Sequence, residues 1–197
     1  MPMSADCVVY VIDDDLELLE SVSWLLGSIG IEPVTLDSAD AFMPVYNGDH
    51  PACLMLDVRM PRMSGIRLQE VLKERFPHVV IIFVSAHGDI KMSVQTMQQG
   101  AFSFLAKPYE PQALLESVQT GMAQAETRFA DYQTRQAVVD KIALLTPRER
   151  EILTLVVEGL PSQQIARQLG MSVKTVDVHR ARIKSKTEAD SINTLVR

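Results

Sequence analysis

The stretch LMLDVRMPRMSG, residues 54–65, decides the fold of the first half of the chain. Its apolar start extends back to Ala52 and is typical of a strand that is buried on both faces. The strand ends at a single acid, Asp57, and a segment of helical periodicity follows from Ser64. A buried strand, an acid and a helix in this order indicate a parallel sheet that is covered by helices.

Short apolar runs and segments of helical periodicity alternate on both sides of this stretch. The alternation predicts an α/β domain with a doubly wound, five-stranded parallel sheet. The expected strands are Cys7–Ile12, Glu32–Leu36, Ala52–Leu56, Val79–Val84 and Phe102–Leu105, and the expected helices are Leu16–Ile29, Ser64–Arg75, Ile90–Gln99 and Pro111–Thr120.

Charge is divided unevenly along the chain, which indicates two domains with different partners. Residues 141–197 contain ten Lys or Arg and six Asp or Glu, a net charge of +4, so the remainder carries −10 of the total of −6. A basic tail on an acidic half is associated with nucleic-acid contact. No apolar run approaches the ~20 residues of a membrane-spanning helix. Cys7 and Cys53 lie in apolar runs, as buried thiols do, and we expect a cytoplasmic protein with no membrane partner.

Polar residues that suit one site follow four of the expected strands. Asp13 and Asp14 follow the first strand, Asp57 the third, Ser85 the fourth and Lys107 the fifth. Sites in open parallel sheets form outside the carboxyl ends of the strands. Because grouped carboxylates repel one another, we expect a divalent cation, Mg²⁺ or Mn²⁺, among them. This set indicates phosphoryl transfer to Asp57, with the metal, Lys107 and the Ser85 hydroxyl stabilising the phosphoryl oxygens.

Residues Val8–Tyr109 resemble the receiver domain of two-component signalling. The resemblance is carried by VVYVIDDD at 8–15, by LMLDVRMPRMSG, by FVSAHGD at 83–89 and by GAFSFLAKPY at 100–109. It implies a flavodoxin-like fold and a phosphorylated Asp57, with a cognate sensor histidine kinase as the phosphoryl donor. It also implies that Asp13 and Asp14 handle Mg²⁺, and that Asp14, Asp57 and the backbone carbonyl of Arg59 are direct ligands.

The same resemblance implies a switch. Ser85 and Phe104 would move together on phosphorylation and remodel the face built from the fourth helix, the fifth strand and the fifth helix. Phe104 has an alternative role as an ordinary core residue. Ser85 stands where Thr is commoner, and Arg62 replaces a frequent Gly; neither change removes a catalytic group.

A rival interpretation is an aspartyl-phosphate phosphohydrolase of the haloacid dehalogenase type. Such enzymes have a second Asp two residues after the nucleophile, and this position is Arg59 here. A Gly-rich phosphate loop with Lys-Ser or Lys-Thr is also missing from the sequence. We therefore expect a regulator and not an enzyme. Asp15, the last acid of the first run, is expected to cap the following helix.

Apolar or small residues recur beyond Pro111 at alternating spacings of four and three. The pattern predicts a long linker helix to about Ala143 that docks a second copy of the chain. The alternative is a surface helix that packs on its own domain. We expect a receiver domain over 1–121, a linker helix over 122–143 and a DNA-binding domain over 144–197. The positions of the seam are Val118, Met122, Ala125, Phe129, Tyr132, Gln136, Val139 and Ala143.

A helix-turn-helix follows the linker. Thr146 to Glu149 form a capping box before one helix, Ser162–Leu169 form a second, and Ser172 caps an amphipathic third helix from Val173. Residues 145–197 resemble the all-α, four-helix, LuxR-type domain through LTPREREIL, GLPSQQIARQLGMSVKTVDVHRARI and a closing Leu195–Arg197. With the receiver attached, the chain resembles regulators of the FixJ and NarL group.

This resemblance implies that Val173–Lys186 enters the major groove. Asp177 replaces a frequent lysine, Pro161–Gln163 replace Ser-Asn-Lys, and Thr187 replaces a core Leu. These departures leave open a receiver that acts through protein contact, with weak or no DNA binding. The candidates for facing DNA are Lys174, Thr175, Asp177, Val178, Ala181 and Arg182, with His179, Arg180 and Lys186 nearer the phosphates.

Phosphorylation is expected to act as a population shift. Phospho-Asp57 would favour a homodimer of receivers and place two recognition helices about one DNA turn apart. The expected partners are therefore the kinase, promoter DNA and a second copy, with RNA polymerase as a further candidate.

Overall fold

The computed structural model describes residues 7–86 and 90–188. The chain divides into two compact units, Met1–Tyr132 and Gln133–Arg197. In the described part, no helix is both long and apolar enough to cross a membrane.

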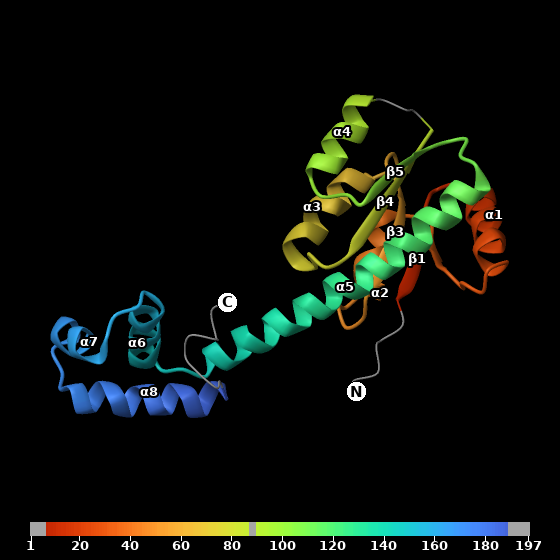
Figure 1. The fold of residues 1–197 in the computed structure, drawn as a ribbon. Coiled ribbons are helices and arrows are strands. Elements are labelled where there is room, and N and C mark those ends of the chain that lie inside the picture. The colour runs from red at the N-terminus through yellow and green to blue at the C-terminus, as the bar shows by residue number, and fades with distance from the viewer. Residues whose placement is uncertain (1–6, 87–89, 189–197) are drawn as a thin grey trace. The chain divides into compact units, whose positions relative to one another are not determined.

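The first unit is built on a five-stranded parallel sheet with the strand order β2-β1-β3-β4-β5 (Figure 1). This confirms the predicted doubly wound sheet. Its strands are β1 (Val8–Ile12), β2 (Val34–Leu36), β3 (Ala52–Asp57), β4 (Val80–Ser85) and β5 (Ser103–Ala106). Its helices are α1 (Leu16–Gly27), the 3₁₀ helix η1 (Ala39–Ala41), α2 (Phe42–Val45), α3 (Gly65–Arg75), α4 (Ile90–Gln98) and the start of α5 (Pro111–Ala143).

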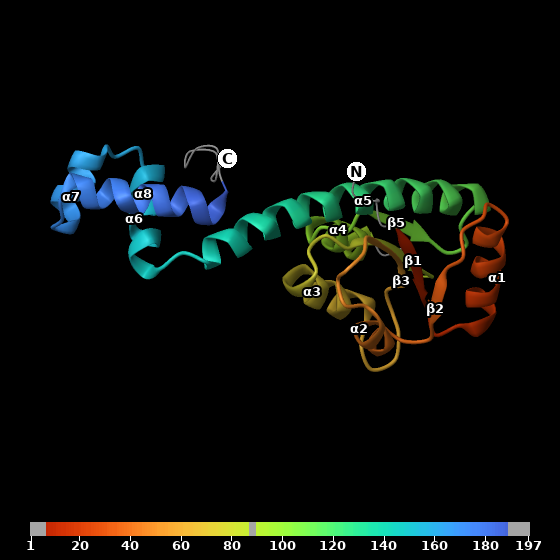
Figure 2. The ribbon, with the colours of Figure 1, turned by 90° about the horizontal axis from the view of Figure 1, so that it is seen from below.

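Alternate residues of the strands point to opposite faces of the sheet, so each face has its own core. Tyr10, Leu54 and Phe83 belong to the core under η1, α2 and α3. Val11 and Ile82 belong to the other core, which α1 and α5 cover. Figure 2 shows α5 and α3 on opposite sides of the strands. The fully apolar strands of the sequence are thus explained by burial on both faces.

The two cysteines confirm the prediction of buried thiols. Cys7 and Cys53 are free and buried in the core beneath α1 and α5. Burial raises the pKa of the Cys7 thiol to about 12 and also raises the pKa of Cys53. Both thiols are therefore protonated at neutral pH and act as apolar core groups.

The main differences from the predicted elements lie between β2 and β3. Strand β2 begins at Val34 instead of Glu32, and η1 with α2 was not predicted at all. Each of these short helices makes only about one turn, so the sequence shows no helical periodicity there. Phe42 and Tyr46 nevertheless fill the core there, with ring centroids 5.1 Å apart.

Helix α5 is continuous over 33 residues, and the boundary between the units falls within it. The predicted long helix to Ala143 is confirmed. Val118 and Ala125 are buried in the core of the first unit, and Phe129 and Tyr132 pack their rings against His78. This first part of the proposed seam therefore packs on its own domain. Farther along, Gln136 is exposed and Val139 is 56% exposed.

The second unit contains α6 (Pro147–Val157), α7 (Ser162–Leu169) and α8 (Val173–Thr187), with α8 packed across both other helices (Figure 2). Thr146 and Glu149 form the predicted capping box, and Gly170 ends α7 in the left-handed conformation. Ile152, Ile165 and Ile183 are buried in its core. The closing segment of the expected four-helix domain, 189–197, lies outside the described residues.

Gly121 permits α5 to lie close to the sheet. A Cβ atom there would be 2.8 Å from Cys53 Sγ and 3.0 Å from Ile82 Cδ1. We expect Gly121→Ala to lower the free energy of unfolding by about 1–3 kcal/mol, because the helix must move off the strands. Gly27→Ala is the matched control, since nothing lies within 4 Å of its Cβ position. Denaturant unfolding of both variants tests this; an equal effect at the two positions would contradict it.

Candidate functional site

Three charged side chains meet at the carboxyl edge of the sheet. The Lys107 ammonium donates to Asp13 Oδ2 at 2.6 Å and to Asp57 Oδ1 at 2.9 Å. Asp13 and Asp57 are only 3% and 7% exposed. Strands β1 and β3 are neighbours with Ile12 paired to Leu56, so the acids that follow these residues emerge side by side. The sequence prediction placed all three in one site.

The loop after β3 is shaped around Asp57. The backbone N–H of Arg59 donates to Asp57 Oδ2 at 2.6 Å, which holds the second carboxylate oxygen. A Cβ atom on Gly65 would collide with the Asp57 carbonyl oxygen, so helix α3 can begin here only with glycine. Arg62 has φ +65°, in the left-handed region that favours glycine. This conformation accounts for the frequent Gly that the resemblance implies at that position.

The loop after β5 places Lys107. Strand β5 pairs with β4, Ser85 opposite Ala106, and the Lys107 N–H donates to the Ser85 carbonyl at 2.8 Å. Ser85 is 2% exposed, next to the acidic cluster along the same edge. The Lys107–Pro108 peptide bond is cis. The Lys107 side chain reaches the acids at the ends of β1 and β3.

At this site, burial and ion pairing shift the pKa values of the charged side chains in opposite directions. Burial raises the pKa of Asp57, although the hydrogen bond and charge of Lys107 act in the opposite direction. Burial also pulls the pKa of Lys107 down, but its hydrogen bonds to Asp13 and Asp57 and their charges outweigh burial, so this pKa is raised. One ammonium therefore faces two carboxylates, and the site keeps an excess of negative charge when both acids are ionised.

The remaining residues of the acidic run are placed differently. Asp15 accepts hydrogen bonds from the N–H groups of Glu17 and Leu18, which confirms its predicted role as the cap of α1. Asp14 is exposed. In the described part of the chain, no three His, Cys, Asp or Glu side chains are grouped as metal ligands. Phe104 is half-buried against the core that contains Phe83, with which it pairs across β4 and β5.

Helix α8 presents one polar face and one buried face. Val176, Ile183 and Thr187 point into the core, and Thr187 takes the place expected for a core Leu. His179, Arg180 and Lys186 are half-buried. The residues predicted to face DNA are all exposed: Lys174, Thr175, Asp177, Val178, Ala181 and Arg182.

Two contacts of α8 were not predicted. Asp177 Oδ1 accepts a hydrogen bond from the Ser162 hydroxyl at 2.8 Å, which joins the start of α7 to α8. Lys186 Nζ donates to Glu149 Oε2 at 2.7 Å and to the Leu144 carbonyl at 3.3 Å. The partners of both pairs lie far apart in sequence and leave no local pattern from which the contacts could be predicted.

Comparison with known proteins matches one family model to residues within each of the two units. The family model described as "Response regulator receiver domain" matches residues 9–119. The model described as "Bacterial regulatory proteins, luxR family" matches residues 143–197.

Similarity to individual proteins extends over nearly the whole chain. The transcriptional regulatory protein TdiR of Thauera aromatica is 43% identical over 95% of this chain and 83% of its own length. The transcriptional regulatory protein FixJ of Bradyrhizobium diazoefficiens is 35% identical over 96% of this chain and 92% of its own. A structure of the response regulator StyR has a TM-score of 0.72 at 41% identity and covers 98% of this chain and 97% of that one.

The Glu149 carboxylate makes the stability of the second unit dependent on pH. Hydrogen bonds from Lys186 and from the Thr146 N–H lower its pKa from the usual 4.5 to about 2. Because the folded-state pKa is the lower one, this stabilisation is present above about pH 4.5 and is lost as the pH falls toward 2.

We expect Glu149→Gln to remove this pH dependence and to cost roughly 1 kcal/mol at neutral pH. The measurement is urea unfolding at several pH values, followed through NMR signals of α6 and α8. Glu158→Gln, at the exposed end of α6, is the control and should keep the parental pH profile. An unaltered profile in Glu149→Gln would contradict the assignment.

Proposed function

Because the chain belongs to the response regulators that join a receiver domain to a LuxR-type DNA-binding domain, we propose that its switch is the phosphorylation of Asp57 by a cognate sensor histidine kinase. The observation that carries the proposal is the buried Asp57 carboxylate, held between the Lys107 ammonium and the Arg59 N–H at the carboxyl edge of the sheet. The output is regulation of transcription at promoter DNA.

The chain's own residues orient the acceptor and balance its charge. An Asp57 oxygen forms the new bond to phosphorus while the P–N bond to the phosphohistidine of the kinase breaks, and the electron pair remains on the imidazole. Lys107 stays protonated because two carboxylates surround it, so it can neutralise a phosphoryl oxygen. The Ser85 hydroxyl, at the end of the neighbouring strand β4, is proposed to stabilise a phosphoryl oxygen together with Lys107.

A divalent cation, Mg²⁺ or Mn²⁺, suits the donor set of this site. The donors are hard oxygens, and two buried carboxylates face one ammonium, so the site has a charge excess that a cation offsets. The proposed holders are Asp13, Asp14, Asp57 and the backbone carbonyl of Arg59. When bound, the cation supplies further neutralisation of the phosphoryl oxygens.

The proposed response involves the end of β4 and strand β5. Ser85 and Phe104 lie on these two paired strands. In the proposed response, Ser85 shifts toward the phosphoryl group and the Phe104 side chain moves with it. We assign the receiver to 1–121, the linker helix to 122–143 and the DNA-binding domain to 144–197. The exposed Gln136 and Val139 of the linker remain open to a second copy in a phosphorylated homodimer.

DNA binding is assigned to the exposed face of α8. Lys174 and Arg182 lie on that face, while Arg180 also reaches the Ser162 hydroxyl at 3.4 Å. Lys186 is engaged with Glu149, so we give it a supporting role in α8 placement beside its proposed phosphate contact. The Asp177 carboxylate is not an isolated charge, because Ser162 donates to it.

Phosphorylation is tested by intact mass after incubation with acetyl phosphate and Mg²⁺. We expect a gain of one phosphoryl group, ~80 Da, in the parental chain and none in Asp57→Asn. Asp37→Asn is the matched control, because Asp37 follows β2 at the same edge of the sheet, and it should gain the group normally. Equal modification of Asp57→Asn would place the acceptor elsewhere.

Asp177 is tested by charge removal. Asp177→Asn keeps an acceptor for Ser162 but removes a negative charge from the proposed DNA face. Affinity for a random-sequence duplex should rise roughly fivefold, as expected for one unit charge ~4 Å from a phosphate in water. Fluorescence anisotropy measures it, with Glu158→Gln as the charge-matched control. An unchanged affinity would mean that this face of α8 does not approach the phosphates.

A further inference from the structure

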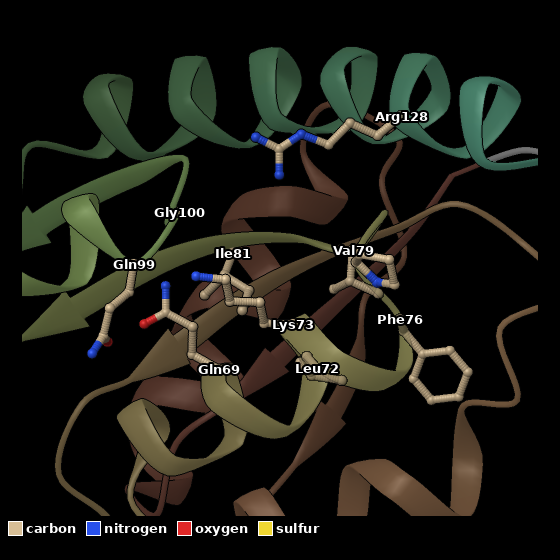
Figure 3. Close-up of a pocket in the computed structure, with 10 residues that line it drawn as sticks. Gln69, Leu72, Lys73, Phe76, Val79, Ile81, Gln99, Gly100 and Arg128 are labelled. Carbon is tan, nitrogen blue, oxygen red and sulfur yellow. The ribbon is translucent and has the colours of Figure 1, made fainter. Parts of the chain in front are cut away.

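A cavity in the receiver lies at the end of β4 that is remote from Asp57 (Figure 3). Its volume is about 280 Å³. Val79, which precedes β4, and Ile81, near its start, line the cavity, whereas Ser85 ends the strand roughly 13 Å beyond Ile81 at ~3.3 Å per residue. Leu72 and Phe76 supply further apolar wall. The cavity is therefore separate from the phosphorylation site.

Gln69 places an unpaired acceptor in this wall. Its side chain is 3% exposed, and Nε2 donates to the Thr96 carbonyl on α4 at 3.1 Å. That bond fixes the orientation of the amide, because a flipped amide would set two oxygens against each other. Gln69 Oε1 and Gln99 Oε1 are buried, and neither has a hydrogen-bond partner within the protein. A buried acceptor without a donor lowers the stability of the fold. A ligand that donates to it removes this cost, and the free energy recovered contributes to binding.

Two cations border the same space. Figure 3 shows the Arg128 guanidinium extending from α5 toward the cavity, and Lys73 extending from α3. Among the described residues, neither forms an ion pair. Of the acids lining the adjoining hollow, Glu70 is already paired with Arg67 at 2.6 Å, and Glu74 is exposed. The charge that faces the cavity is thus predominantly positive.

We propose that this cavity binds a small organic anion, namely a hydroxylated aromatic carboxylate. The carboxylate lies between Lys73 and Arg128, the ring lies against Leu72 and Ile81, and the hydroxyl donates to Gln69 Oε1. A cavity of ~150 Å³ is enough for benzene, so the volume admits a substituted ring. Binding at this cavity would be an activity separate from phosphorylation of Asp57, and it does not depend on that phosphorylation.

Binding is tested on the full chain by isothermal titration calorimetry with 3-hydroxybenzoate and 4-hydroxybenzoate. We expect saturable binding of at least one isomer, weakened roughly tenfold or more by Arg128→Gln. Arg135→Gln, an exposed arginine farther along α5, is the matched control and should bind as the parental chain does. Benzoate lacks the donor and phenol lacks the anion, so both should bind more weakly.

Asp57→Asn separates this proposal from the phosphorylation switch, because it should bind the hydroxybenzoate unchanged. Amide NMR shifts should appear at Gln69, Ile81 and Arg128. Three results would overturn the proposal: no saturable binding of either isomer up to about 10 mM; affinity unaffected by Arg128→Gln; or shifts confined to the Asp57 end of β4. Circular dichroism of each variant ensures that a loss of binding is not a loss of fold.

Discussion

Two carboxylates buried beside each other need a cation, and Lys107 supplies it between Asp13 and Asp57. The three side chains come from the ends of β1, β3 and β5, so their meeting requires a particular sheet. Strands β1 and β3 must be neighbours and must end level, which the pairing of Ile12 with Leu56 achieves. Strand β5 must lie on the far side of β4, so that the long Lys107 side chain reaches across. The strand order of the receiver therefore brings the two carboxylates and the ammonium within hydrogen-bonding distance of one another.

Close approach of helices to the sheet keeps that arrangement rigid. Gly65 lets α3 begin against the Asp57 carbonyl, and Gly121 lets α5 lie on Cys53 and Ile82. Each glycine removes the one atom that would push a helix away from a strand. In the second unit, a polar contact and not a close approach of backbones helps to hold the helices together. Lys186 holds the end of α8 to the buried Glu149, which is also part of the cap of α6.

The sequence was informative wherever a feature is local. Buried strands, the acids that follow them, the cap at Asp15 and the capping box at Thr146 are all visible in a few consecutive residues. Away from the carboxyl edge of the sheet, where the topology itself groups the site residues, contacts between distant segments were not predictable. Ser162 meets Asp177 only after α7 and α8 pack, and the seam along α5 could not show that Val118 faces its own domain. The cavity combines side chains of α3, the turn before β5 and α5, none of which forms a motif.

Helix α4 relates the two ends of the receiver. Its Thr96 carbonyl accepts from Gln69 beside the cavity, and its first residue, Ile90, comes five residues after Ser85 in the sequence. Suppose that phosphorylation repositions α4. The cavity would then have a different affinity for the proposed anion in the two states, because Gln69, bonded to α4, and Gln99 would move relative to Arg128. Linkage is reciprocal, so the ligand would have to shift the switch by the same free energy. A filled cavity would therefore act as an input to the regulator beside the kinase, through residues that never touch Asp57.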